Sequence, residues 1–380
     1  MNEPEAIRPP ILVTAREHLE EVAAEIHRTG RVAVDIESNS FYVYKEKTCL
    51  IQITAGGVDY IVDPLAVKDL SALGPMFADP ATQKVFHAGE YDVVCLKRDY
   101  RFSFASLFDT MIASRLLGFK ELGLAAAIER HFGVKLSKKL QRADWGRRPL
   151  SEAHIRYAQL DTHYLLQLAD IQTALLREKG LEAEAAEAFG KLARSTPVER
   201  IFDPEGFWRL ARGLSPDGRQ LAVLRELYLL REREAENRNR ATFRVMPDEV
   251  LPRLAMALPR DLGALRGVRG MTPYLLDNYG SAVLAAVKRG LAAPPIDPDS
   301  REKALKKRDP RQGRLFEKLR LWRKAKGQQL GVDPVDLMST ADLKAIARVA
   351  IAGGNDILGP LSLLKRSRYG AEILRLIRGR

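Results

Sequence analysis

Strand and helix patterns alternate in the first half of this 380-residue chain and then give way to helical patterns alone. Short apolar runs bounded by glycine, proline or charged residues predict buried strands. We expect such strands over 32–36, 49–54, 60–62 and 84–87. No strand pattern follows Glu178. A mixed α/β sheet covered by helices, followed by all-α domains, is therefore the predicted fold class.

Helical patterns fill the spaces between and after these strands. Thr14 and Glu17 have the spacing of a capping box, and they predict a helix that stops at Gly30. A second helix is expected to begin near Glu90. Further helices are expected over 110–117, 122–132, 151–178 and 181–194.

Proline and glycine divide the helical second half into units. The stretches 195–197 and 203–204 indicate a boundary, and 292–298 is a proline-rich linker. The helical regions on either side of this linker are similar in size, so they are either repeats or unrelated units. We expect three domains: 1–195, 210–291 and 300–380.

The net charge of +12 is concentrated in the second half. Residues 201–380 carry 35 Lys and Arg against 21 Asp and Glu, whereas residues 1–200 carry 26 against 28. This asymmetry favours a polyanionic partner, either nucleic acid or an anionic membrane surface; a basic surface kept for solubility is the alternative. The basic half has no long helix with a wide apolar face and a uniformly basic one, which argues against the membrane.

The other bulk features predict a cytoplasmic protein. Cys49 and Cys95 stand alone in apolar runs, so neither a disulfide framework nor a zinc motif is expected. The N-terminal sequence has no basic and apolar signal-peptide pattern, and no apolar stretch approaches the roughly 20 residues that span a bilayer.

Acidic residues follow the predicted strands in a distinctive pattern. Asp35 and Glu37 are two residues apart on a strand, so both side chains point to one face, where a cation would offset their repulsion. Asp92 falls in the first turns of a helix after a later strand. Tyr157 and Asp161 are four residues apart and share a helix face. Taken singly, each feature also fits a solvated turn, a helix-dipole contact or an ordinary packed aromatic.

Together these residues resemble the four-carboxylate active site of the ribonuclease D family. Residues 10–180 resemble its RNase H-like 3′–5′ exonuclease domain, 215–290 its HRDC-type nucleic-acid-binding domain, and 313–380 a second, more divergent HRDC-like copy. His154 departs from the family, which often has Gln at that position. The further matching stretches are 50–53, 86–89, 109–110 and 144–150.

The resemblance implies a 3′→5′ exoribonuclease that uses two divalent ions, Mg²⁺ or Mn²⁺, and releases 5′-mononucleotides. It implies that Asp35 contacts both ions, that Glu37 and Asp161 complete the site of the first, and that Asp92 holds the second. It implies further that Tyr157 orients the attacking water. Precursors of transfer RNA with single-stranded 3′ tails are the implied partners, and no obligate protein partner or membrane is expected.

Basic residues near Trp145 are candidate substrate contacts. Lys138, Arg147 and Arg148 could clamp the RNA backbone or a base, or form an ordinary solvated loop. Trp145 itself is expected to be a packing residue. Two rival functions stay open: a 3′→5′ DNA exonuclease with the same metal chemistry, and a non-catalytic nucleic-acid-binding scaffold.

Overall fold

The computed structural model describes residues 7–197, 202–300, 310–330, 333–354 and 356–378. The N-terminal residues that bear on the signal peptide, and parts of the expected 1–195 and 300–380 domains, lie outside the described residues. The chain divides into two compact units. One comprises residues 1–38, 48–197 and 308–380, and the other comprises 39–47 and 198–307.

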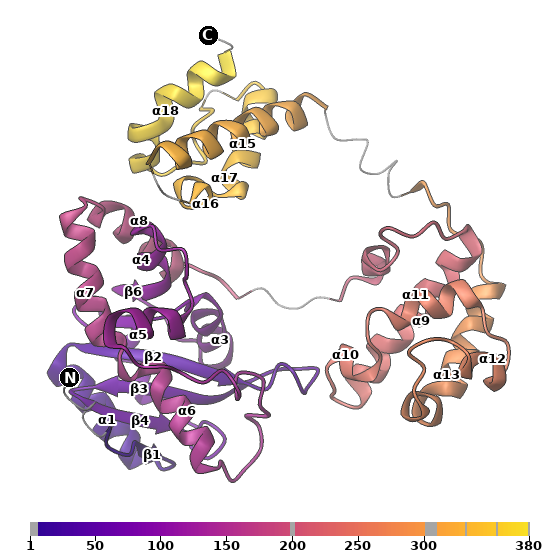
Figure 1. The fold of residues 1–380 in the computed structure, drawn as a ribbon, viewed down its shortest axis with the longest axis horizontal. Helices are drawn as coiled ribbons and strands as arrows, with labels where there is room; N and C mark the ends of the chain where they lie inside the picture. The colour runs from indigo at the N-terminus through magenta and orange to yellow at the C-terminus, as the bar shows by residue number, and fades with distance from the viewer. Residues whose placement is uncertain (1–6, 198–201, 301–309, 331–332, 355, 379–380) are drawn as a thin grey trace. The chain divides into compact units, whose positions relative to one another are not determined.

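A six-stranded mixed sheet forms the centre of the first unit (Figure 1). Its strand order is β1-β4-β3-β2-β5-β6. The β2–β3 and β3–β4 pairs are antiparallel, and the other pairs are parallel. The strands are β1 (Ile11–Val13), β2 (Arg31–Ser38), β3 (Thr48–Ala55), β4 (Val58–Val62), β5 (Gln83–Phe86) and β6 (Leu107–Asp109). The predicted mixed sheet is confirmed, and the structure adds two three-residue strands, β1 and β6, at its edges.

Helices cover both faces of this sheet. Residues 32–34 of β2 and every residue of β3 are buried, so both faces of the sheet are covered at its centre. Helices α1 (Arg16–Thr29) and α3 (Glu90–Tyr100) contact β3, and α6 (Glu152–His163) contacts β2, β3 and β4. The other helices of the domain are η1 (Ser71–Leu73), α2 (Gly74–Ala78), α4 (Thr110–Leu116), α5 (Leu124–Phe132), α7 (Leu165–Glu178) and α8 (Glu182–Ala193).

Two local predictions are wrong. The N-cap of α1 is Ala15, and no side chain caps this helix, so the expected capping box of Thr14 and Glu17 does not form. The predicted stop at Gly30 is confirmed: its φ of 63° is left-handed, a conformation in which glycine is unstrained. The single helix expected over 151–178 is two helices, α6 and α7, with Tyr164 between them.

The second unit is a helical domain with its own apolar core. Asp217 and Gln220 form a capping box at the start of α9 (Gly218–Asn237), which explains why the helix begins there. The loop 39–47, which leaves β2, belongs to this unit: the Tyr44 hydroxyl donates to Glu232 at 2.6 Å. The helices are α9 (Gly218–Asn237), α10 (Thr242–Val245), α11 (Val250–Ala257), α12 (Leu262–Arg266) and α13 (Pro273–Ala292), preceded by η2 (Pro204–Arg209).

The C-terminal helices repeat one buried feature of this domain. In α9, the Arg231 guanidinium donates to the carbonyl of Met246 at 3.2 Å. In α15, the guanidinium of Arg323 donates to the carbonyl of Met338 at 2.8 Å, across the same separation of 15 residues. This correspondence favours the repeat interpretation. The helices of this C-terminal region are α15 (Pro310–Leu330), α16 (Pro334–Leu337), α17 (Thr340–Ile351) and α18 (Leu363–Arg378).

No helix among the described residues of the chain is long and apolar enough to cross a membrane.

Candidate active site

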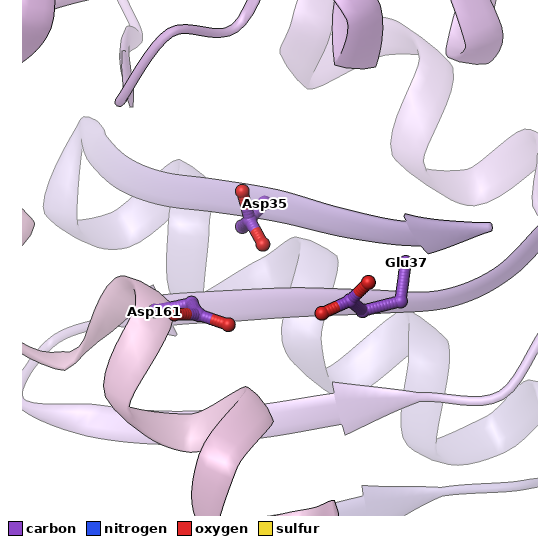
Figure 2. A group of neighbouring side chains, drawn as sticks. All are labelled: Asp35, Glu37 and Asp161. Atoms are coloured by element: carbon purple, nitrogen blue, oxygen red, sulfur yellow. The ribbon is translucent and has the colours of Figure 1, made fainter. Parts of the chain in front are cut away.

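Three of the predicted acids meet above the centre of the sheet. Asp35 and Glu37 project from the same face of β2, and Asp161 projects from α6, which crosses that face (Figure 2). Carboxylate oxygens of all three lie within 4.8 Å of one another. The i, i+2 spacing on a strand aligns the first two side chains, and the packing of α6 on β2, β3 and β4 adds the third.

Asp92 lies beside this cluster, and a hydrogen bond holds it against β2, the strand that carries Asp35 and Glu37. Its carboxylate accepts a hydrogen bond from the backbone N–H of Ile36, at 3.1 Å, between Asp35 and Glu37 in the sequence. Asp92 reaches this position because the chain turns sharply from β5 into α3. Gly89 permits the turn, because a Cβ there would lie 2.5 Å from the Cβ of Phe86. Asp92 is 7% exposed, and it is not part of the three-residue cluster.

The four carboxyl groups are held in a desolvated, mutually repulsive environment. Burial, followed by repulsion from Asp161 and Asp92, raises the pKa of Glu37 to about 9. Burial also raises the pKa of Asp161 to about 8 and that of Asp92 to about 7. The pKa of Asp35 is raised well above its usual range, first by burial and then by its three acidic neighbours. A cation among these groups would remove this strain.

Tyr157 stands one helical turn before Asp161. Burial, with added repulsion from Asp161 and Glu37, raises the pKa of its phenol, so the hydroxyl keeps its proton at working pH. The Tyr157 ring packs 5.8 Å from the ring of Trp145, which is 1% exposed. Trp145 thus packs inside the domain and supports the tyrosine.

The three basic candidates have different surroundings. Lys138 is exposed, and Arg147 has 84% of its side chain exposed beside Asp144. Arg148, in contrast, donates to both carboxylate oxygens of Asp63 and to three backbone carbonyls, those of Cys49, Trp145 and Arg147. These contacts favour a structural role for Arg148 over a substrate contact.

A polar network that the strand and helix patterns of the sequence do not indicate holds α6 on the sheet. Asp59 of β4 accepts hydrogen bonds from Thr54, Gln159 and His163, each at 2.7 Å. Burial alone would raise the pKa of Asp59, but these bonds, led by that of His163, lower it. The sequence does contain one sign of this network, an acidic residue inside the apolar run 58–62.

Comparisons with known proteins place this geometry in a family. Residues 10–177 match a family of 3′-5′ exonucleases, and residues 220–287 match the HRDC domain. Ribonuclease D of Gluconacetobacter diazotrophicus is 32% identical over 75% of this chain and 73% of its own length. The chain belongs to the ribonuclease D family. The resemblance found in the sequence, the mixed α/β fold and the HRDC domain are thereby confirmed.

Eukaryotic relatives of the ribonuclease D family are also similar to this chain. The exosome complex exonuclease RRP6 of Saccharomyces cerevisiae is 32% identical over 71% of the chain and 39% of its own length. The crystal structure of the RRP6 catalytic core of Trypanosoma brucei matches with a TM-score of 0.68 and 30% identity, covering 76% of this chain and 82% of that one. The matched region spans only about a third of the length of the exosome proteins to which this chain is similar.

Proposed function

We propose that this protein is a metal-dependent 3′→5′ exoribonuclease that trims structured RNA and releases 5′-mononucleotides. The observation that carries the proposal is the cluster of Asp35, Glu37 and Asp161, with Asp92 beside it, in a domain of the 3′-5′ exonuclease family. Water attacks the terminal phosphorus, the bond to the 3′ oxygen breaks, and that oxygen leaves with a proton as the shortened strand's 3′ hydroxyl.

The donor set fits two hard divalent cations. Every candidate ligand is a carboxylate oxygen, which Mg²⁺ and Mn²⁺ prefer, and the raised pKa values mean that ionising these carboxyl groups is unfavourable unless a cation balances their charge. Asp35, Glu37 and Asp161 would hold one ion, and Asp35 and Asp92 the other. When bound, such ions make water a better nucleophile and stabilise the departing oxygen.

Tyr157 is suited to orient the attacking water. Its phenol keeps its proton because its pKa is raised, so it serves as a hydrogen-bond donor and not as a base. The packing of its ring against buried Trp145 fixes its direction. Arg147 and Lys138, which are exposed, remain proposed contacts to the phosphate backbone.

The basic helical domains supply affinity for the polyanion. Lys and Arg release counterions when they neutralise phosphates, so the basic 201–380 half offsets the acidity of the catalytic pocket. The domain over 1–195 would thus cleave the RNA, and the domains over 210–291 and 300–380 would bind it. Transfer RNA precursors with short single-stranded 3′ tails remain the proposed substrates, and no protein partner is proposed.

A hairpin with a single-stranded 3′ tail, labelled at its 5′ end, tests the function. RNA and DNA versions are incubated with the protein and Mg²⁺, Mn²⁺ or EDTA, and the released products are separated by chromatography. We expect a metal-dependent ladder that shortens from the 3′ end on RNA, with nucleoside 5′-monophosphates as products. Faster shortening of DNA would reassign the protein as a DNA exonuclease. Binding without shortening would favour the scaffold.

A further inference from the structure

Gln52 lies in the middle of β3 and faces the carboxylate cluster. It is the cross-strand partner of Asp35, and the Cβ atoms of such partners are about 4.5–5.5 Å apart on the same face. Thr54, two residues along the same face, hydrogen-bonds Thr162 of α6 at 2.8 Å. The side chain of Gln52 is therefore directed toward α6, beside Asp35 and close to Asp161.

The amide of Gln52 is buried without partners. The residue is 0% exposed, and neither its amide nitrogen nor its amide oxygen has a hydrogen-bond partner among the described residues. Gln172, which is equally buried on α7, also has an amide oxygen without a partner among the described residues, but its amide nitrogen donates to the carbonyl of Thr110 at 3.1 Å and to the Ser114 hydroxyl at 2.8 Å. A buried amide without partners is costly, so its position at the acidic cluster points to a partner that forms only in the loaded site.

We propose that Gln52 is a positioning residue for the metal-binding carboxylates, and that its amide nitrogen donates to the carboxylate of Asp35 when the site is loaded. The proposal rests on the metal centre described above. Carboxylate ligands of metals are oriented by hydrogen bonds from neighbouring groups. An amide suits this task because it donates without adding positive charge, whereas Lys or Arg would repel the cation that must enter.

Replacement of the amide by an apolar group of similar length tests this role. Gln52→Met removes both polar atoms, and Gln172→Met makes the same change where the amide nitrogen has protein partners. For Gln52→Met we expect the dissociation constant for Mn²⁺, measured by calorimetry, to rise about 10–100-fold. We expect its melting temperature in EDTA to be unchanged or higher. Gln172→Met should melt at a lower temperature and bind Mn²⁺ as the wild type does.

Kinetics add an independent measurement on the same variant. At low Mn²⁺ the kcat of Gln52→Met should fall, and at saturating Mn²⁺ it should recover, with the KM for RNA unchanged throughout. Wild-type affinity for Mn²⁺ in Gln52→Met would overturn the inference. A large fall of its melting temperature in EDTA would do so too, because the amide would then support the metal-free fold. If the wild type itself bound no Mn²⁺, the metal centre would fail together with the inference.

Discussion

Metal binding should release protons from the carboxylate cluster at neutral pH. Glu37 and Asp161 have pKa values raised to about 9 and about 8, so both are mostly protonated at pH 7 in the metal-free protein. Asp92, with a pKa of about 7, is close to half protonated. A cation binds the ionised carboxylates and displaces these protons. We expect these three groups to release at least about two protons per chain at pH 7.

The same pKa values set the dependence of metal affinity on pH. One pKa unit corresponds to about 1.4 kcal/mol. Ionising Glu37 at pH 7 therefore costs about 2.7 kcal/mol, and ionising Asp161 costs about 1.4 kcal/mol. Together these two costs lower metal affinity at pH 7 by about a thousandfold relative to a site in which Glu37 and Asp161 are both ionised. The cost falls as the pH rises through these pKa values, so affinity should increase from pH 6 to pH 9.

Calorimetry measures the proton release directly. Mn²⁺ is titrated at pH 7 in buffers with different ionisation enthalpies, and the slope of the observed enthalpy against them counts the protons. Glu37→Gln is the control, since it removes the group with the highest of the three pKa values and should lower the count by about one. A count near zero at pH 7, or an unchanged count at pH 9, would refute the reasoning, because the carboxylates would already be ionised.

Three further predictions follow from individual side chains. Tyr157→Phe should lower kcat by about 10²–10⁴-fold without changing Mn²⁺ affinity, measured by single-turnover assays and calorimetry. Arg148→Ala should reduce the free energy of unfolding by about 2–3 kcal/mol in urea titrations, because it leaves the partly buried carboxylate of Asp63 without its cation. Arg147 is exposed, so Arg147→Ala should change the free energy of unfolding little and weaken RNA binding. Asp35→Asn should abolish cleavage yet raise the melting temperature in EDTA at pH 8. The pKa of Asp35 is raised in the metal-free fold, so ionisation of Asp35 destabilises that fold as the pH rises through this pKa, and Asn cannot ionise.

Local spacing made the candidate site predictable. The two-residue spacing of Asp35 and Glu37 fixes a shared strand face, and the four-residue spacing of Tyr157 and Asp161 fixes a shared helix face. Neither relation depends on the rest of the fold. The convergence of the strand and helix was expected through the family resemblance, and the structure brings Asp161 to the strand pair.

The roles that depend on distant partners could not be predicted. Arg148 pairs with Asp63, 85 residues away in the sequence, so the chain around Arg148 gives no sign that its donors are engaged. Gln52 faces Asp35 only because of the register of two antiparallel strands. The two edge strands escaped prediction because three residues are too short to show alternation. The capping box failed because Thr14 lies one position before the N-cap that the fold uses.

The carboxylate cluster is proposed to bind two catalytic cations, and their positions can be measured. Crystals soaked in Mn²⁺ and measured near the manganese absorption edge would locate the ions by anomalous scattering. We predict two peaks about 3.5–4 Å apart, one among Asp35, Glu37 and Asp161 and the other between Asp35 and Asp92. Crystals that hold manganese elsewhere, with no peak within ligand distance of these four carboxylates, would contradict this prediction.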